Sequence, residues 1–188
     1  MRSRLAELLD RTEANVKRIE ALQGAFPAAV LNEWRYATRH VVGALDGDRA
    51  DAERLKAEGH LARAYFDSCD ILLDCQLEKA RIFMRDYAIR PEIPSAAMAD
   101  YPGALRTIRD AHRAHGEIQG FSEDEKIAGY GRLEEVVAAL ARVLDEIDAA
   151  APAMAAARRK AQWRERISIA GFVVAVLGLA VALASLLR

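Results

Sequence analysis

The sequence predicts an all-α protein: a cytosolic antiparallel bundle of about five helices, one of them very long, followed by a single C-terminal transmembrane helix. Apolar residues make up 52% of the 188 residues and aromatic residues only 6%. Strands draw on aromatic and β-branched side chains, so this composition disfavours them. Five Pro and eleven Gly leave room for long uninterrupted helices. Apolar side chains also recur at alternating spacings of four and three, the period of one helix face.

The first predicted helix covers 3–24 and ends at Gly24, because glycine commonly terminates helices. Its apolar seam consists of Leu5, Leu9, Thr12, Val16 and Ile19, widened by Leu8 and Leu22. A second helix is predicted over 28–45, and the turn residues Asp46-Gly47 end it.

The third predicted helix, about 49–88, is unusually long, since roughly 40 residues reach ~60 Å. One of its stripes carries polar residues where the spacing normally holds apolar ones: Lys56, His60, Arg63, Asp67, Asp70 and Asp74. Two interpretations stay open. The stripe is either a solvent-exposed face with local ion pairs, or a polar seam that faces another subunit or lines a ligand cavity.

A linker over 90–102 contains three prolines and precedes a fourth helix, about 103–119. The pair Ser122 and Glu125 forms a capping box that opens a fifth helix over about 123–150. The seam of this helix consists of Leu133, Val137, Leu140, Leu144 and Ile147. Pro152 is predicted to mark a joint, since proline disrupts a helix interior.

Charge divides the chain unevenly. From Arg158 onward there are six basic residues and one acid, which leaves 21 basic and 27 acidic residues before it. An acidic body disfavours non-specific coating of nucleic acid. The predicted organisation is a cytosolic bundle over 1–151, a basic juxtamembrane segment over 152–166 and a transmembrane helix over 167–187.

The apolar run 167–187 contains neither charge nor proline. As a helix it would extend ~32 Å, close to the ~30 Å hydrocarbon core of a bilayer. The basic flank predicts a tail-anchored protein of the inner (cytoplasmic) membrane with its N-terminal domain in the cytoplasm. A headgroup-level collar is predicted from Arg158, Arg159, Lys160, Trp163, Arg164 and Arg166. The alternative is a buried core helix.

Small residues form one stripe of this run: Ser168, Gly171, Ala175, Gly178, Ala182 and Ser185. Within lipid the hydrophobic effect does not drive helices together, so their association depends on close backbone approach at small residues. The stripe therefore predicts a homo-oligomer, and four or more copies could enclose a pore. The alternative is a plain anchor in contact with lipid.

The segment EWRYATRH, residues 33–40, is both cationic and aromatic. Arginine can bind phosphates while rings stack on bases, so Arg35, Tyr36, Arg39 and His40 are candidate ligand-binding residues. The alternative is a bundle helix with Trp34 packed inward and its arginines reaching to solvent. No metal or cofactor is predicted, since the sequence holds no CxxC or HExxH motif and no glycine-rich phosphate loop.

Two pairs, Arg35 with His40 and Arg109 with His115, resemble the Arg-x4–6-His pattern of HEPN ribonucleases. That resemblance implies metal-free RNA cleavage at a dimer cleft. At ~100° per residue, Arg35 and His40 point ~140° apart on one helix. They do not converge by themselves.

The architecture also resembles the membrane effectors of Hailong-type bacterial anti-phage defence, through RYATRHVVGALDG and GHLARAYFDSCDILLDCQ. The resemblance implies a homo-oligomeric ion channel. A DNA oligomer from a partner nucleotidyltransferase would hold it shut until infection. It also implies ligand contacts at Arg35, Arg39, Lys56, His60 and Arg63. A non-conducting scaffold that recruits a partner is the remaining alternative.

Overall fold

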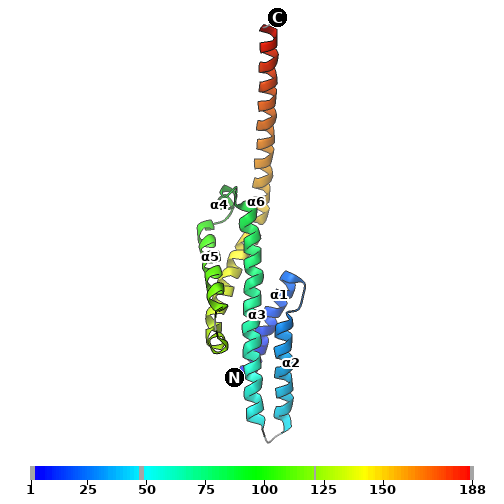
Figure 1. Ribbon diagram of the computed structural model, residues 1–188, viewed down its shortest axis with the longest axis vertical. Helices are drawn as coiled ribbons and strands as arrows, with labels where there is room; N and C mark the ends of the chain where they lie inside the picture. The colour runs from blue at the N-terminus through cyan, green and yellow to red at the C-terminus, as the bar shows by residue number, and fades with distance from the viewer. Residues whose placement is uncertain (1–2, 47–48, 121, 187–188) are drawn as a thin grey trace. The chain divides into compact units, whose positions relative to one another are not determined.

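The computed structural model describes the backbone of residues 3–46, 49–120 and 122–186, with the side chains of 46, 123–124, 126–130 and 179–186 excepted. Over these residues the chain is all-α, as predicted (Figure 1). The elements are α1 (Arg4–Gln23), α2 (Ala28–Gly43), the 3-10 turn η1 (Ala44–Asp46), α3 (Ala50–Tyr87), α4 (Glu92–Ala97), α5 (Tyr101–Ile118) and α6 (Glu123–Leu186).

The chain divides into two compact units. The first comprises Met1–Asp86 and Pro102–Asp145, which hold α1, α2, nearly all of α3 and α5, and the beginning of α6. The second comprises Tyr87–Tyr101 and Glu146–Arg188, which hold α4 and the remainder of α6.

Local signals explain where the helices begin and end. Ser3 caps α1 by accepting a hydrogen bond from the Ala6 amide at 3.3 Å. Gly24 ends α1 with φ 70°, a left-handed conformation that glycine adopts without strain. At the start of α6, Glu125 accepts a 2.8 Å hydrogen bond from the Ser122 amide. This contact confirms the predicted helix start there.

Two expectations about proline were wrong. The predicted linker contains α4, because Pro91 and Pro94 lie at the N-cap and in the first turn, where a missing amide proton costs little. Pro152 does not interrupt α6, which is a single helix of 64 residues. Proline removes only its own hydrogen bond to the preceding turn, and the alanine-rich surroundings favour helix strongly.

The core of the first unit follows the predicted seams with one exception on α1. Leu8, Thr12, Val16 and Ile19 are buried there, whereas Leu9 is 44% exposed. The Thr12 hydroxyl is fully buried and donates a 2.7 Å hydrogen bond to the Leu8 carbonyl, which satisfies a polar group inside the core. On α6 the predicted seam residues of the first unit, Leu133, Val137, Leu140 and Leu144, are all buried. Ile147, the last residue of the predicted seam, is buried as well and belongs to the second unit.

The end of α6 is exposed rather than buried. Ile167 is 50%, Phe172 71% and Leu177 61% exposed, so the buried-core alternative is wrong for 167–178. Within the described part of the chain, no helix combines the length and apolar character needed to cross a membrane. The side chains of 179–187, including Ala182 and Ser185 of the predicted stripe, lie outside the described residues.

Candidate functional site

Four of the six residues in the polar stripe of α3 contact other helices of the same chain, whereas the exposed Lys56 pairs with Glu53 on its own helix. Near one end, His60 and Arg63 contact Glu33 of α2. Farther along, Asp70 and Asp74 contact Nε2 of His115 on α5, at 3.4 and 3.2 Å. These four residues therefore lie in interhelical contacts within the first unit, while Lys56 fits the interpretation of a solvent-exposed face with a local ion pair.

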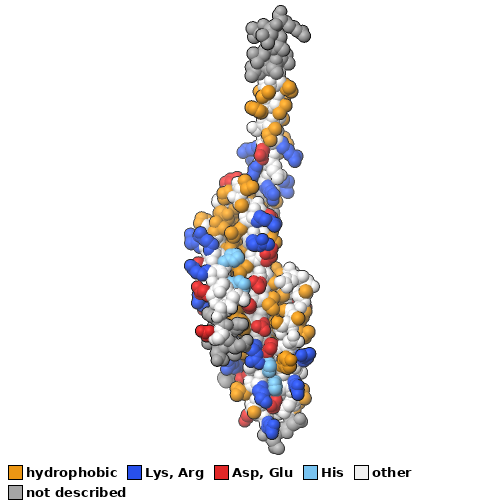
Figure 2. Space-filling model, viewed as in Figure 1, with side chains coloured by type: hydrophobic (Ala, Val, Ile, Leu, Met, Phe, Trp, Pro, Cys, Tyr) orange, Lys and Arg blue, Asp and Glu red, His pale blue; other side chains and the backbone are white. Residues whose placement is uncertain are grey.

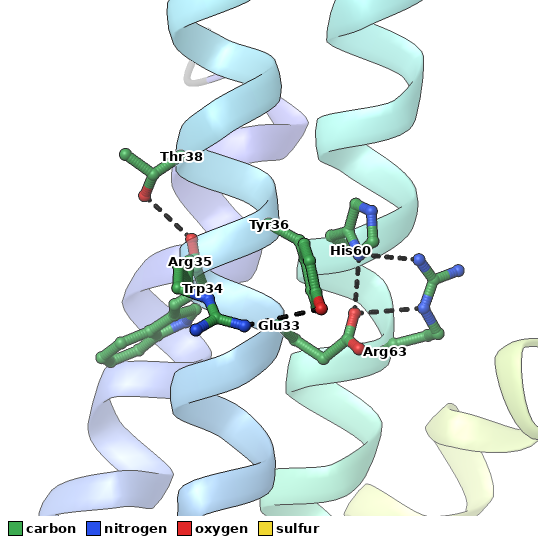
Figure 3. A network of polar contacts seen from close by, with 7 residues as sticks. All are labelled: Glu33, Trp34, Arg35, Tyr36, Thr38, His60 and Arg63. Carbon is green, nitrogen blue, oxygen red and sulfur yellow. Dashed lines mark hydrogen bonds and ion pairs between the residues drawn. The ribbon is translucent and has the colours of Figure 1, made fainter.

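Glu33 is the centre of one contact group (Figure 3). Its Oε2 lies 2.8 Å from Nδ1 of His60 and 3.1 Å from Nε of Arg63. Nη2 of Arg63 also lies 2.8 Å from Nδ1 of His60. A protonated Nδ1 donates to Glu33, whereas an unprotonated Nδ1 accepts from Arg63. The position of the His60 proton therefore decides which of the two contacts is a hydrogen bond.

Rings from both helices stack beside this group. The Tyr36 and His60 ring centroids are 5.3 Å apart, with 28° between the planes. The His40 and His60 centroids are 5.2 Å apart, with 13° between the planes. The Arg35 guanidinium lies over the Tyr36 ring, 5.1 Å from its centroid, within the range of a cation–π contact.

A second carboxylate, Glu53, binds the other histidine. Its Oε2 lies 2.6 Å from Nδ1 of His40, and its Oε1 accepts a 2.7 Å hydrogen bond from Lys56. The hydrogen bond from Lys56, followed by that from His40, lowers the pKa of Glu53 to about 2. Gly43 leaves room for this carboxylate, since an added Cβ would lie 3.3 Å from Oε2.

We expect Glu53 to make stability depend on pH in the acid range. Its folded pKa of about 2 lies below the ordinary value. The stabilisation is therefore complete above about pH 4.3 and is lost as the pH falls towards about 2. Urea unfolding of the full chain at pH values between these limits measures the effect. The free energy of unfolding should fall less steeply with decreasing pH in Glu53→Gln than in the wild type. Glu135→Gln, which removes an exposed carboxylate of α6, is the control; an unchanged profile for Glu53→Gln would contradict the prediction.

The structure brings together most of the predicted ligand-binding residues. Tyr36, His40 and His60 form the stack, and Arg35, Lys56 and Arg63 border it. Arg39 is exposed on α2. Trp34 packs against the buried cluster of Val16, Val30 and Ala64, so the interpretation that it points inward is confirmed.

Sequence reasoning missed the two carboxylates, although a signal for them exists. Both helices carry a glutamate seven residues before a histidine: Glu33 and His40 on α2, Glu53 and His60 on α3. Residues seven apart share a helix face. In the antiparallel pair, each glutamate contacts the histidine of the other helix.

The predicted Arg–His pairs have other partners. Arg35 lies over Tyr36 while His40 binds Glu53. His115 contacts Asp70 and Asp74, and Arg109 is exposed on α5. The contacts therefore engage the two histidines with carboxylates rather than with the arginines of the ribonuclease pattern.

Two open grooves lie elsewhere in the first unit. One, of 480 Å³, lies between α1 and α3 and is lined by Leu22, Cys75 and Ile82 with acidic neighbours. The other, of 340 Å³, lies between α5 and α6 beside Arg113 and Arg132. Among the described residues, no group of three or more His, Cys, Asp or Glu side chains could hold a metal ion. Comparison of the chain with family models, curated proteins and solved structures finds no match.

Proposed function

We propose that this chain is a single-span membrane effector of anti-phage defence. Its copies, four or more, associate through the segment 167–187 to form a gated ion pore. A cytosolic ligand of the oligonucleotide class controls the gate. The body lies on the cytoplasmic side of the inner membrane.

The exposed apolar end of α6 is the observation that carries the proposal. Phe172, Val174 and Leu177 are each more than 60% exposed, on a helix that continues directly from the basic segment (Figure 2). Apolar surface left in water costs roughly 25 cal/mol per Å². Lipid tails would cover this surface, and a helix satisfies its own backbone hydrogen bonds within a bilayer.

The glycines of the small-residue stripe support association between copies. A Cβ added at Gly171 or Gly178 would meet nothing within 4 Å. Neither glycine is therefore required for packing within its own chain. Small residues on one face of an apolar helix allow a second helix backbone to approach closely.

The exposed cations beside the ring stack supply the proposed ligand contacts. His60 and Arg63 are engaged by Glu33, whereas Arg35 and Arg39 are exposed. The Lys56 side chain is 56% exposed. Arginine forks bind phosphates. Arg35, which lies over the Tyr36 ring, and Arg39 would therefore supply the phosphate contacts. Such a ligand controls a gate only if it binds the closed state better than the open state.

The test measures ion flux through vesicles that contain the purified full-length protein, with and without short DNA oligomers. We expect flux that the oligomers reduce. A variant with 167–187 replaced by an unrelated apolar span should still insert but should not conduct. Equal flux from this variant would contradict a pore built from these helices, and a non-conducting wild type would favour the scaffold.

A further inference from the structure

We infer that the loop between α3 and α4 is a second membrane contact, which places Ile89 in the headgroup region of an anionic phospholipid surface. The inference rests on the proposed membrane anchor. It adds a part of the chain outside the apolar run, and it names the class of lipid bound.

An ion pair holds the loop at the start of the apolar run. Nη2 of Arg90 donates to Oε2 of Glu165 at 2.5 Å. Glu165 lies two residues before Ile167, which is ~3 Å along the helix axis. Both partners belong to the second unit. If the apolar run enters the bilayer at Ile167, the loop lies at the level of the lipid headgroups.

The loop exposes an apolar side chain at that level. Ile89 is 93% exposed, the largest exposure among the large apolar side chains of the described residues. Beside it in the loop, Arg90 is held by Glu165. On α6, Trp163 is 66% exposed, and tryptophan is enriched at membrane interfaces. An interfacial location explains both exposures together.

The charge of residues 158–166, which adjoin the apolar run, indicates which class of lipid the loop contacts. The basic residues of this segment surround α6 just before the apolar run (Figure 2): Arg158, Arg159, Lys160, Arg164 and Arg166. The one acid among them, Glu165, is paired with Arg90. The exposed Glu92 opens α4 on the other side of the loop. The surplus of positive charge complements anionic headgroups, which attract clustered Lys and Arg beside a membrane helix.

To test this contact, an environment-sensitive fluorophore is attached to the full-length Ile89→Cys variant. The labelled protein is then added to vesicles that contain quencher-bearing lipids. The native Cys69 and Cys75 are 1% and 7% exposed, so labelling is directed to the new thiol. Phe172→Cys reports on the apolar run and Leu55→Cys on the first unit; both native side chains are 71% exposed. We expect loss of emission at 89 and 172 and unchanged emission at 55.

The outcomes separate this inference from the proposed function. Quenching at 172 without quenching at 89 overturns the loop contact and leaves the anchor standing. Absence of quenching at both positions overturns the anchor and the loop contact together.

The preference for anionic lipid is tested with the same fluorophore at position 89. Quenching at 89 should be stronger in phosphatidylglycerol vesicles than in phosphatidylcholine vesicles. The difference should shrink in Arg159→Gln/Lys160→Gln and persist in Arg18→Gln/Arg142→Gln, which removes the same charge from exposed sites of the first unit. Equal quenching in both lipids would overturn the anionic selectivity.

Discussion

Replacing Gly171 and Gly178 together by Leu is expected to reduce ion flux at least tenfold while the protein still inserts into vesicles. Among the described residues, an added Cβ at either position meets no atom within 4 Å apart from the backbone of its own helix. Any effect must therefore arise where α6 contacts another helix or lipid. A loss of about 1.4 kcal/mol in association corresponds to a tenfold drop in the association constant.

The matched control is Ile169→Leu/Val176→Leu, which has the same seven-residue spacing on another helix face. It should retain both flux and oligomer size, measured by the mass of the detergent-solubilised protein. Wild-type flux and mass in the glycine variant would show that the small-residue stripe does not mediate association.

The largest loss of stability is expected for Leu140→Ala. Leu140 is fully buried on the seam of α6 within the first unit. Truncation removes buried apolar surface and leaves a cavity, which together cost about 2–5 kcal/mol for a leucine in a packed core. Urea unfolding of the full-length protein in mild detergent, followed by circular dichroism, measures the change.

Leu55→Ala makes the same chemical change at a side chain that is 71% exposed. It should alter the free energy of unfolding by no more than about 0.5 kcal/mol. Similar values for the two variants would mean that the first part of α6 does not pack into the bundle.

Helical periodicity was sufficient to predict most of the fold. The seam of α6 is buried as the spacing of Leu133, Leu140 and Ile147 predicts, and α3 runs over Ala50–Tyr87 as the long pattern predicts. The errors came from proline. Pro152 lies inside one helix, where the alanine-rich surroundings outweigh the local preference of proline. Pro91 and Pro94 instead lie at the start of α4, where proline is tolerated, so the same prolines fit a linker or a helix start.

The candidate site was predictable only in part. Cationic and aromatic residues on one segment identified Arg35, Tyr36 and His40, because those side chains are close in sequence. The contacts of Glu33 and Glu53 join residues 27 and 13 positions apart. Such contacts depend on how α2 and α3 align, which a pattern within one helix does not describe. The repeated glutamate–histidine spacing becomes informative only once the helices are known to be antiparallel.

The crossed contacts, Glu33 with His60 and His40 with Glu53, also determine how far α2 can slide along α3. A slip of one helical turn, ~5.4 Å, would break both contacts at once and separate the stacked rings. The two helices therefore share a single register. Movement transmitted through this hairpin would therefore tilt α2 and α3 together, without a slip of a full turn between the two helices.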